Sequence, residues 1–154
     1  MMMPSTDSNP SRVSLPAILA GLGALPFLAS SLLLTLGVYN LPLLGSTAEI
    51  LRSYSLAIAV FMCGIHWGQY LQDAQARNLN LLMVSNGLTV ICWLGFLMAS
   101  FVAYFVIVIA IFLVLLWVDY RLHKAGRITA RYFRMRLAVT AVVCASLALP
   151  LSFS

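Results

Sequence analysis

The feature that most constrains this fold is a long uncharged run. No Asp, Glu, Lys or Arg occurs between Arg77 and Asp119. A single helix of that length would measure about 60 Å, roughly twice the thickness of the hydrocarbon core of a bilayer. The run is therefore expected to fold back as two membrane spans, with the turn near residues 99–101. The whole chain is 62% hydrophobic and 8% charged, which is typical of membrane proteins.

Further apolar runs predict three more spans. The fold class is therefore expected to be all-α, a polytopic transmembrane helix bundle of five spans that forms one domain over 14–154. Residues 1–13 are polar and lack periodicity, so they are expected to form a disordered tail. Gly126 is expected to end the fourth helix and Thr129 to cap the fifth. The approximate spans are 14–39, 47–72, 79–98, 101–120 and 130–153.

The distribution of Lys and Arg predicts the orientation. If the N-terminus is inside, Arg12, Arg77 and the six cations of the fourth loop lie inside, and only Arg52 lies outside. The positive-inside rule then predicts N-terminus in and C-terminus out, as a multi-pass protein of the bacterial inner (cytoplasmic) membrane. The loop cations are expected to contact anionic lipid headgroups, or else a soluble partner. They are Arg121, Lys124, Arg127, Arg131, Arg134 and Arg136.

The second span separates two faces at 100° per residue. A polar face runs through Arg52, Ser55 and His66, and a small-residue face through Ala57, Gly64 and Gly68. A helix whose two sides both avoid lipid is expected to lie centrally in the bundle. The fourth span is apolar all round and is expected to face lipid.

Small residues predict helix packing. Gly64 and Gly68 form a GxxxG motif, which lets helix backbones approach closely. We interpret the motif as packing within the chain rather than as a dimer contact. Gly21 and Ala24 belong to a similar stripe on the first span.

Polar side chains gather toward the predicted inner ends of the spans. His66, Gln69, Asn86 and Asp119 can all reach the inner-leaflet interface. One interpretation is hydrogen bonding between helices. The other is binding of a quinone headgroup, a lipid headgroup or a proton. A metal would require more His, Cys or carboxylate ligands, so neither a metal nor a cofactor is predicted.

Catalytic signatures are missing from the sequence. It has no phosphate-cradling glycine loop, no nucleophile beside a base and no pair of intramembrane carboxylates, so no enzyme is predicted. The net charge of +5 is accounted for by topology, and no nucleic-acid partner is expected. The leading hypothesis is an accessory or assembly partner of a membrane complex, or a homo-oligomer. The alternative is a small-molecule binder with a quinone or phospholipid headgroup near His66, Asn86 and Asp119.

Four segments carry a resemblance to a known family. They are Gly-Leu-Gly-Ala-Leu-Pro-Phe at 21–27, Gly-Ile-His-Trp-Gly at 64–68, Asp-Tyr-Arg at 119–121 and the basic run at 125–137. Together they resemble the bacterial domain-of-unknown-function family that includes the mitochondrial transmembrane protein sixty-nine. The resemblance implies a multi-span inner-membrane protein without an established activity, and it implies no catalytic residues.

Overall fold

The computed structural model describes residues 15–72 and 80–153. Within these ranges, five helices are long and apolar enough to cross a membrane, as expected for a multi-pass membrane protein. The predicted tail at 1–13 lies outside the described residues. The helices are α1 (Leu15–Thr35), α2 (Thr47–Gln72), α3 (Leu81–Met98), α4 (Phe101–Lys124) and α5 (Ala130–Ala148), followed by the short 3-10 helix η2 (Pro150–Phe153).

The uncharged run folds back where the sequence predicted. Helix α3 ends at Met98 and α4 begins at Phe101. Ser100 is the N-cap of α4, and its side chain accepts a hydrogen bond from the Ala103 backbone N–H. A serine at this position satisfies one of the unpaired N–H groups of the first turn, which explains why the new helix starts here.

The turn between α4 and α5 also follows the predicted signals. Gly126 has a φ of +70°, and its N–H donates to the His123 carbonyl while the Arg127 N–H donates to the Leu122 carbonyl. Glycine adopts this left-handed conformation without steric penalty. The Thr129 side chain accepts from the Tyr132 N–H at the start of α5. Helix α4 continues to Lys124, one turn past the expected end of its span at 120.

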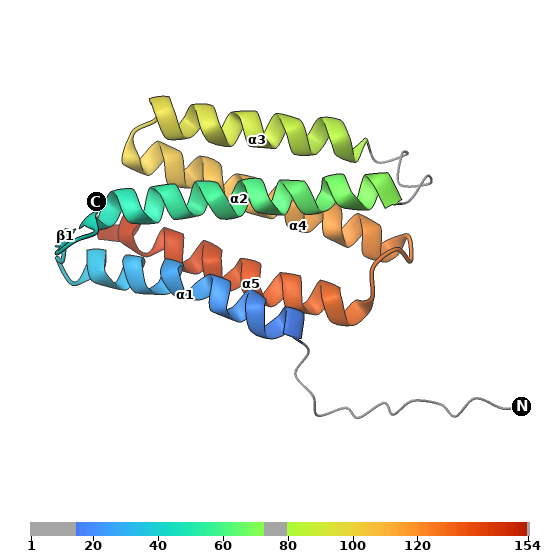
Figure 1. Ribbon diagram of the computed structural model, residues 1–154, viewed down its shortest axis with the longest axis horizontal. Helices are drawn as coiled ribbons and strands as arrows, with labels where there is room; N and C mark the ends of the chain where they lie inside the picture. The colour runs from blue at the N-terminus through green and yellow to red at the C-terminus, as the bar shows by residue number, and fades with distance from the viewer. Residues whose placement is uncertain (1–14, 73–79, 154) are drawn as a thin grey trace, which may run out of the picture.

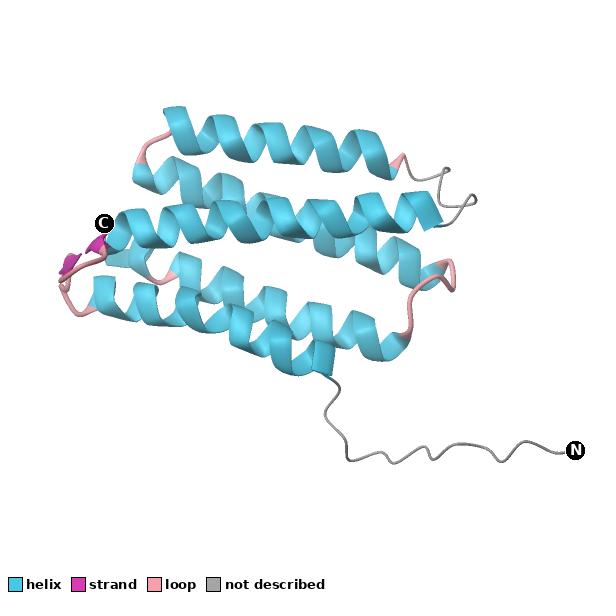
Figure 2. Ribbon diagram, viewed as in Figure 1, coloured by secondary structure: helices cyan, strands magenta, loops and turns pink. Residues whose placement is uncertain are grey.

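The helices lie side by side along the long axis of the molecule (Figures 1 and 2). Helix α2 contacts α1, α3 and α4, and α4 contacts α2, α3 and α5. A two-stranded hairpin of β1 (Asn40–Leu41) and β2 (Gly45–Ser46) joins α1 to α2, with Asn40 paired to Ser46 and Leu41 to Gly45. The hairpin lies at one end of the bundle, and the α4–α5 turn lies at the other (Figure 1).

The prediction that α4 faces lipid all round is wrong. One face of α4 forms the centre of the core, where Tyr104, Phe105, Val108 and Leu115 are completely buried. Opposite residues such as Val106 and Leu113 are exposed on the outside of the bundle. Hydropathy cannot separate these faces, because a lipid-facing side chain and a core side chain are equally apolar.

The glycines of α1 and α2 also depart from the prediction. Within the described residues, a Cβ atom built on Gly21, Gly64 or Gly68 would meet no neighbouring atom within 4 Å, so these glycines mediate no packing between the described helices. Ala24 is buried, as expected for a packing residue. Helix α2 therefore buries its polar face and exposes its small-residue face. GxxxG spacing permits close helix contact but does not create it.

Candidate ligand cavity and its buried ionic cluster

Three helices bring three ionisable side chains together at one end of the bundle. His66 belongs to α2, Asp119 to α4 and Arg136 to α5. Each lies five or six residues from the helix end beside the α4–α5 turn. At 1.5 Å per residue, the cluster sits about 8–9 Å inside the bundle.

Asp119 is the hub of this cluster. Its Oδ2 accepts from the Arg136 Nε at 2.8 Å, and its Oδ1 lies 3.0 Å from the His66 Nε2. The side chains of Asp119, His66 and Arg136 are only 1%, 3% and 8% exposed. An ionised carboxylate only accepts hydrogen bonds, so Nε2 of His66 must carry the proton that it donates. The Asp119 carboxylate and the Arg136 guanidinium carry opposite formal charges, which cancel within the pair.

The burial of these charges is tolerable only because they are paired. An isolated charge in an apolar interior costs several kcal/mol of desolvation, and direct hydrogen-bonded pairing offsets most of that cost. The cluster therefore ties α2, α4 and α5 together at this end of the bundle. Arg136 makes a further contact with α2, since its Nη1 donates to the Met62 Sδ.

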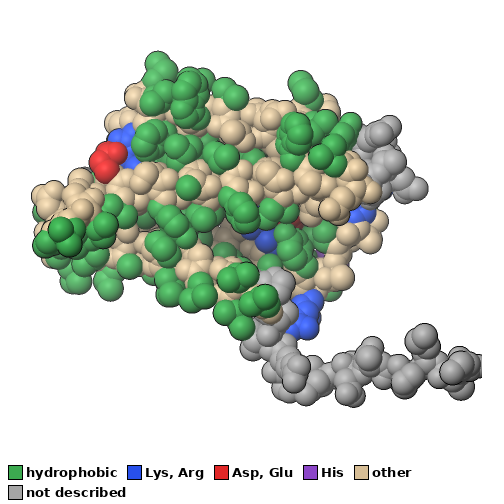
Figure 3. All heavy atoms as spheres, in the orientation of Figure 1, with side chains coloured by type: hydrophobic (Ala, Val, Ile, Leu, Met, Phe, Trp, Pro, Cys, Tyr) green, Lys and Arg blue, Asp and Glu red, His purple; other side chains and the backbone are tan. Residues whose placement is uncertain are grey.

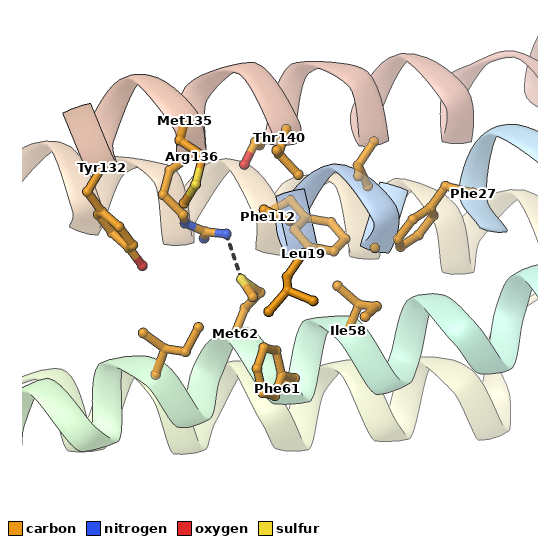
Figure 4. A pocket seen from close by; sticks show the side chains of 15 residues that line it. Leu19, Phe27, Ile58, Phe61, Met62, Phe112, Tyr132, Met135, Arg136 and Thr140 are labelled. Atoms are coloured by element: carbon orange, nitrogen blue, oxygen red, sulfur yellow. Dashed lines mark hydrogen bonds between the residues drawn. The ribbon is translucent and has the colours of Figure 1, made fainter. Parts of the chain in front are cut away.

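A cavity of about 320 Å³ adjoins Arg136. Its wall is mainly apolar and comes from α1, α2, α4 and α5; Arg136, Tyr132 and Thr140 are its polar side chains (Figure 4). Figure 3 shows a basic side chain in a hollow between hydrophobic side chains. The lining residues are Leu19, Ala20, Gly23, Phe27, Ile58, Phe61, Met62, Ile65, Phe112, Tyr132, Met135, Arg136, Val139, Thr140 and Val143.

The shape and chemistry of the cavity match an amphiphile. Its volume lies at the lower end of the range of about 300–1,000 Å³ found for small-molecule sites. The apolar wall can hold a hydrocarbon chain, and the Arg136 guanidinium supplies hydrogen-bond donors at one end. Among the described residues, no group of three or more His, Cys, Asp or Glu could hold a metal ion.

The structure brings together only part of the predicted polar set. His66 and Asp119 are in direct contact. Gln69 is half-buried, and its buried Oε1 has no hydrogen-bond partner among the described residues. Asn86 is exposed on α3 and forms no hydrogen bond with His66 or Asp119 in the described part of the chain. Its predicted place in the site is wrong, because its side chain lies outside the bundle.

Arg136 requires a second correction. It was grouped with the loop cations, yet it is buried and bound to Asp119. The signal that could have identified it is the Thr129 cap, which places Arg136 six residues into α5, about 9 Å from its start. That depth is too great for a loop residue.

The other five cations of the fourth loop lie toward the surface. Arg121, Lys124, Arg131 and Arg134 are exposed and Arg127 is half-buried. Arg121 stacks on Trp117 and Lys124 on Tyr120, with cation-to-ring distances of 5.2 and 5.8 Å. Aromatic rings and cations of this kind are typical of a membrane–water interface. Contact of these cations with anionic lipid or with a partner stays a prediction.

The opposite end of the bundle carries a separate polar cluster around Arg52. Its Nη2 donates to the Phe96 carbonyl at 2.6 Å, and its guanidinium lies 5.2 Å from the ring centres of both Phe96 and Tyr104. The Tyr104 hydroxyl donates to the Arg52 carbonyl and lies 3.2 Å from the Ser55 hydroxyl. This cluster joins α2, α3 and α4 and does not line the cavity.

Comparison with known proteins gives one match. Residues 13–152 match the model of a family described as a protein of unknown function, DUF3429. No curated protein and no solved structure matches the chain. The match spans nearly all of the sequence, so it covers every residue of the ionic cluster and of the cavity.

Proposed function

We propose that this chain, which belongs to the DUF3429 family of proteins of unknown function, is a non-enzymatic multi-pass membrane protein that binds an amphiphile in the cavity beside Arg136. The observation that carries the proposal is the direct junction between an apolar cavity and a buried ionic cluster. Arg136 belongs to both.

The junction is hard to explain by stability alone. A cavity forfeits packing contacts, and a buried ion pair is seldom more stabilising than apolar residues of the same volume. Both departures from a well-packed core occur at the same place here, within the reach of one side chain. Local departures of this kind are expected at functional sites. The coincidence therefore favours a binding site.

The ligand class follows from the cavity wall. A molecule with an apolar chain and one polar end, such as a lipid or an isoprenoid quinone, would place its chain among the α1 and α2 residues. Its polar end would meet Arg136 and Tyr132. This proposal keeps the small-molecule alternative that the sequence suggested near His66, Asn86 and Asp119, but replaces Asn86 by Arg136 as the residue that meets the ligand.

We extend the proposal to orientation and location. With the N-terminus inside a bacterial inner membrane, the ionic cluster and the exposed loop cations would share the cytoplasmic side. Alkaline phosphatase fused after residue 154 should then be active, whereas a fluorescent-protein fusion at that point should be dark; the reverse result would contradict the orientation. The link to the mitochondrial transmembrane protein sixty-nine belongs to the same proposal.

A cavity-filling pair of variants tests binding. Gly23 lines the cavity and has room for a side chain, whereas Gly21 has equal room but faces outside. After extraction into polymer-bounded native discs, mass spectrometry should find an amphiphile with the wild type and with Gly21→Leu, and little with Gly23→Leu. Equal amounts of bound amphiphile in all three proteins would contradict the proposal.

A second candidate function rests on the exposed glycines of α2. Gly64 and Gly68 leave an outward surface on which another helix could pack closely. This surface supports a function of the chain as an accessory or assembly partner of a membrane complex, or as a homo-oligomer. A protein that co-purifies with the wild type and is lost on Gly64→Leu, while the bound amphiphile is retained, would support this candidate.

A further inference from the structure

We propose that the polar end of the ligand is an uncharged oxygen acceptor that replaces the Met62 thioether at Nη1 of Arg136. A ketone, an ester carbonyl or a hydroxyl would each provide such an oxygen. The inference rests on the proposed amphiphile-binding function and specifies its headgroup. Three features of the ionic cluster lead to it.

The first feature is charge. Asp119 already neutralises Arg136, and both of its oxygens are occupied by hydrogen bonds to Arg136 and His66. An anionic headgroup would therefore meet a guanidinium that is already paired with a buried carboxylate. The anionic headgroup would lose its hydration, and no unpaired cation would be present to compensate for that loss. An uncharged headgroup avoids that cost.

The second feature is the hydrogen-bond partner of Arg136. Its Nε donates to Asp119, but its Nη1 donates to the sulfur of Met62. A thioether is a weak acceptor, and a carbonyl or hydroxyl oxygen is a better one. Met62 and Arg136 both line the cavity, so a ligand oxygen would reach Nη1 from inside it. Methionine is flexible, and rotation of its side chain would release the donor.

The third feature is orientation. Asp119 fixes the guanidinium through Nε, and His66 fixes the other carboxylate oxygen. Figure 4 shows the guanidinium pointing across the cavity toward Met62. The donor is thus held in place before a ligand arrives, which limits the entropy lost on binding. In this arrangement His66 and Asp119 act as positioning residues and do not touch the ligand.

Three short-chain probes test the charge preference on the full chain in lipid discs. They are a decyl-substituted benzoquinone, dioctanoylglycerol and dioctanoylphosphatidylglycerol. Native mass spectrometry over a concentration series gives the affinity of each. We expect one uncharged probe to bind at least about tenfold more tightly than the anionic one, and the better of the two shows whether the oxygen belongs to a quinone or a glyceride.

Two methionine variants test the role of the sulfur. Met62→Leu removes the thioether and keeps the side-chain volume, whereas Met135→Leu changes another lining methionine, one that accepts no hydrogen bond from Arg136 within the described part of the chain. We expect Met62→Leu to bind the uncharged probe about two- to tenfold more tightly, because Nη1 then lacks a protein acceptor. Met135→Leu should bind as the wild type does. Neither substitution breaks the ion pair, so both variants should fold.

The outcomes separate the inference from the proposed function. Tighter binding of phosphatidylglycerol by the wild type, or equal behaviour of the two methionine variants, would overturn the inference while amphiphile binding stands. If no probe binds and no amphiphile co-purifies, both fail. In Asp119→Asn the site should carry a net positive charge and prefer the anionic probe; an unchanged preference would also count against the inference.

Discussion

The sharpest test of the ionic cluster is the replacement of Asp119 by Asn. The substitution preserves shape but removes the charge that compensates Arg136, whose side chain is only 8% exposed. It also weakens the acceptors for the Arg136 Nε and the His66 Nε2, now 2.8 and 3.0 Å from the carboxylate oxygens. Breaking one partner of a buried pair in this way costs about 3–5 kcal/mol.

Thermal unfolding of the purified protein in detergent measures this cost. For a chain of this size, 1 kcal/mol corresponds to about 2–4 °C, so the midpoint should fall by about 6–20 °C. The matched control is Glu49→Gln, because Glu49 also pairs with an arginine, Arg52, but at 3.4 Å and with a side chain 60% exposed. An exposed pair contributes about 0–1 kcal/mol, so this variant should melt within about 4 °C of the wild type.

The comparison is decisive because both variants neutralise one acidic side chain. If Asp119→Asn melts no lower than Glu49→Gln, the Asp119 carboxylate does not stabilise a buried cation. Loss of α-helical circular dichroism at 20 °C would mean a larger cost than 5 kcal/mol. In that case the milder variant Asp119→Glu, which keeps the charge, should restore the helical signal.

Three further outcomes can be checked by the same unfolding assay. His66→Ala should lower the unfolding free energy by about 1.5–3 kcal/mol, because a hydrogen bond to a charged group is lost. Tyr104→Phe should cost about 0.5–1.5 kcal/mol by removing a buried hydroxyl, whereas Tyr39→Phe, at an exposed residue, should cost nothing measurable. Gly64→Ala should stabilise α2 by about 0.5–1 kcal/mol. Gly95→Ala should stabilise the protein less than Gly64→Ala does, or destabilise it, because the new Cβ would lie 3.2 Å from the Ile107 Cδ1. A larger stabilisation by Gly95→Ala than by Gly64→Ala would contradict this packing.

Much of the fold could be predicted from local signals. Hydrophobic length gives the five helices, and turn chemistry at Gly126 and Thr129 marks the turn between α4 and α5. The buried face of α2 could be predicted because polar and small side chains such as Ser55 and His66 recur on one side of it. These features depend on neighbouring residues along the chain, which the sequence displays directly.

The errors arise where two environments look alike. Core and lipid are both apolar, so the buried face of α4 could not be recognised from its residues. The same ambiguity affects Gly64, since a glycine facing another helix and one facing outward have identical sequence patterns. Asn86 shows the converse problem. A polar residue on an apolar helix suggests a partner inside the bundle, but its position on α3 is set by contacts that other residues make.

The pairing of Asp119 with Arg136 could have been predicted from the sequence. The two residues flank the α4–α5 turn at nearly equal distance, so an antiparallel helix pair places them at the same depth. Arg121 and Arg131 are closer to Asp119 along the chain. Both are exposed near the helix ends. A charge inside the bundle needs a partner at its own depth, and Arg136 meets that condition.

A double substitution separates the structural from the binding role of the cluster. Asp119→Leu combined with Arg136→Met replaces the ion pair by apolar side chains, which commonly costs little or even stabilises a protein. Only His66 then lacks its partner, so the unfolding free energy should lie within about 2 kcal/mol of the wild-type value, well above that of Asp119→Asn. The cavity would keep its apolar wall but lose its donor. If the cluster is retained for binding, the double variant should fold and still lose the preference for uncharged oxygen headgroups; if it is purely structural, the probe affinities should not change.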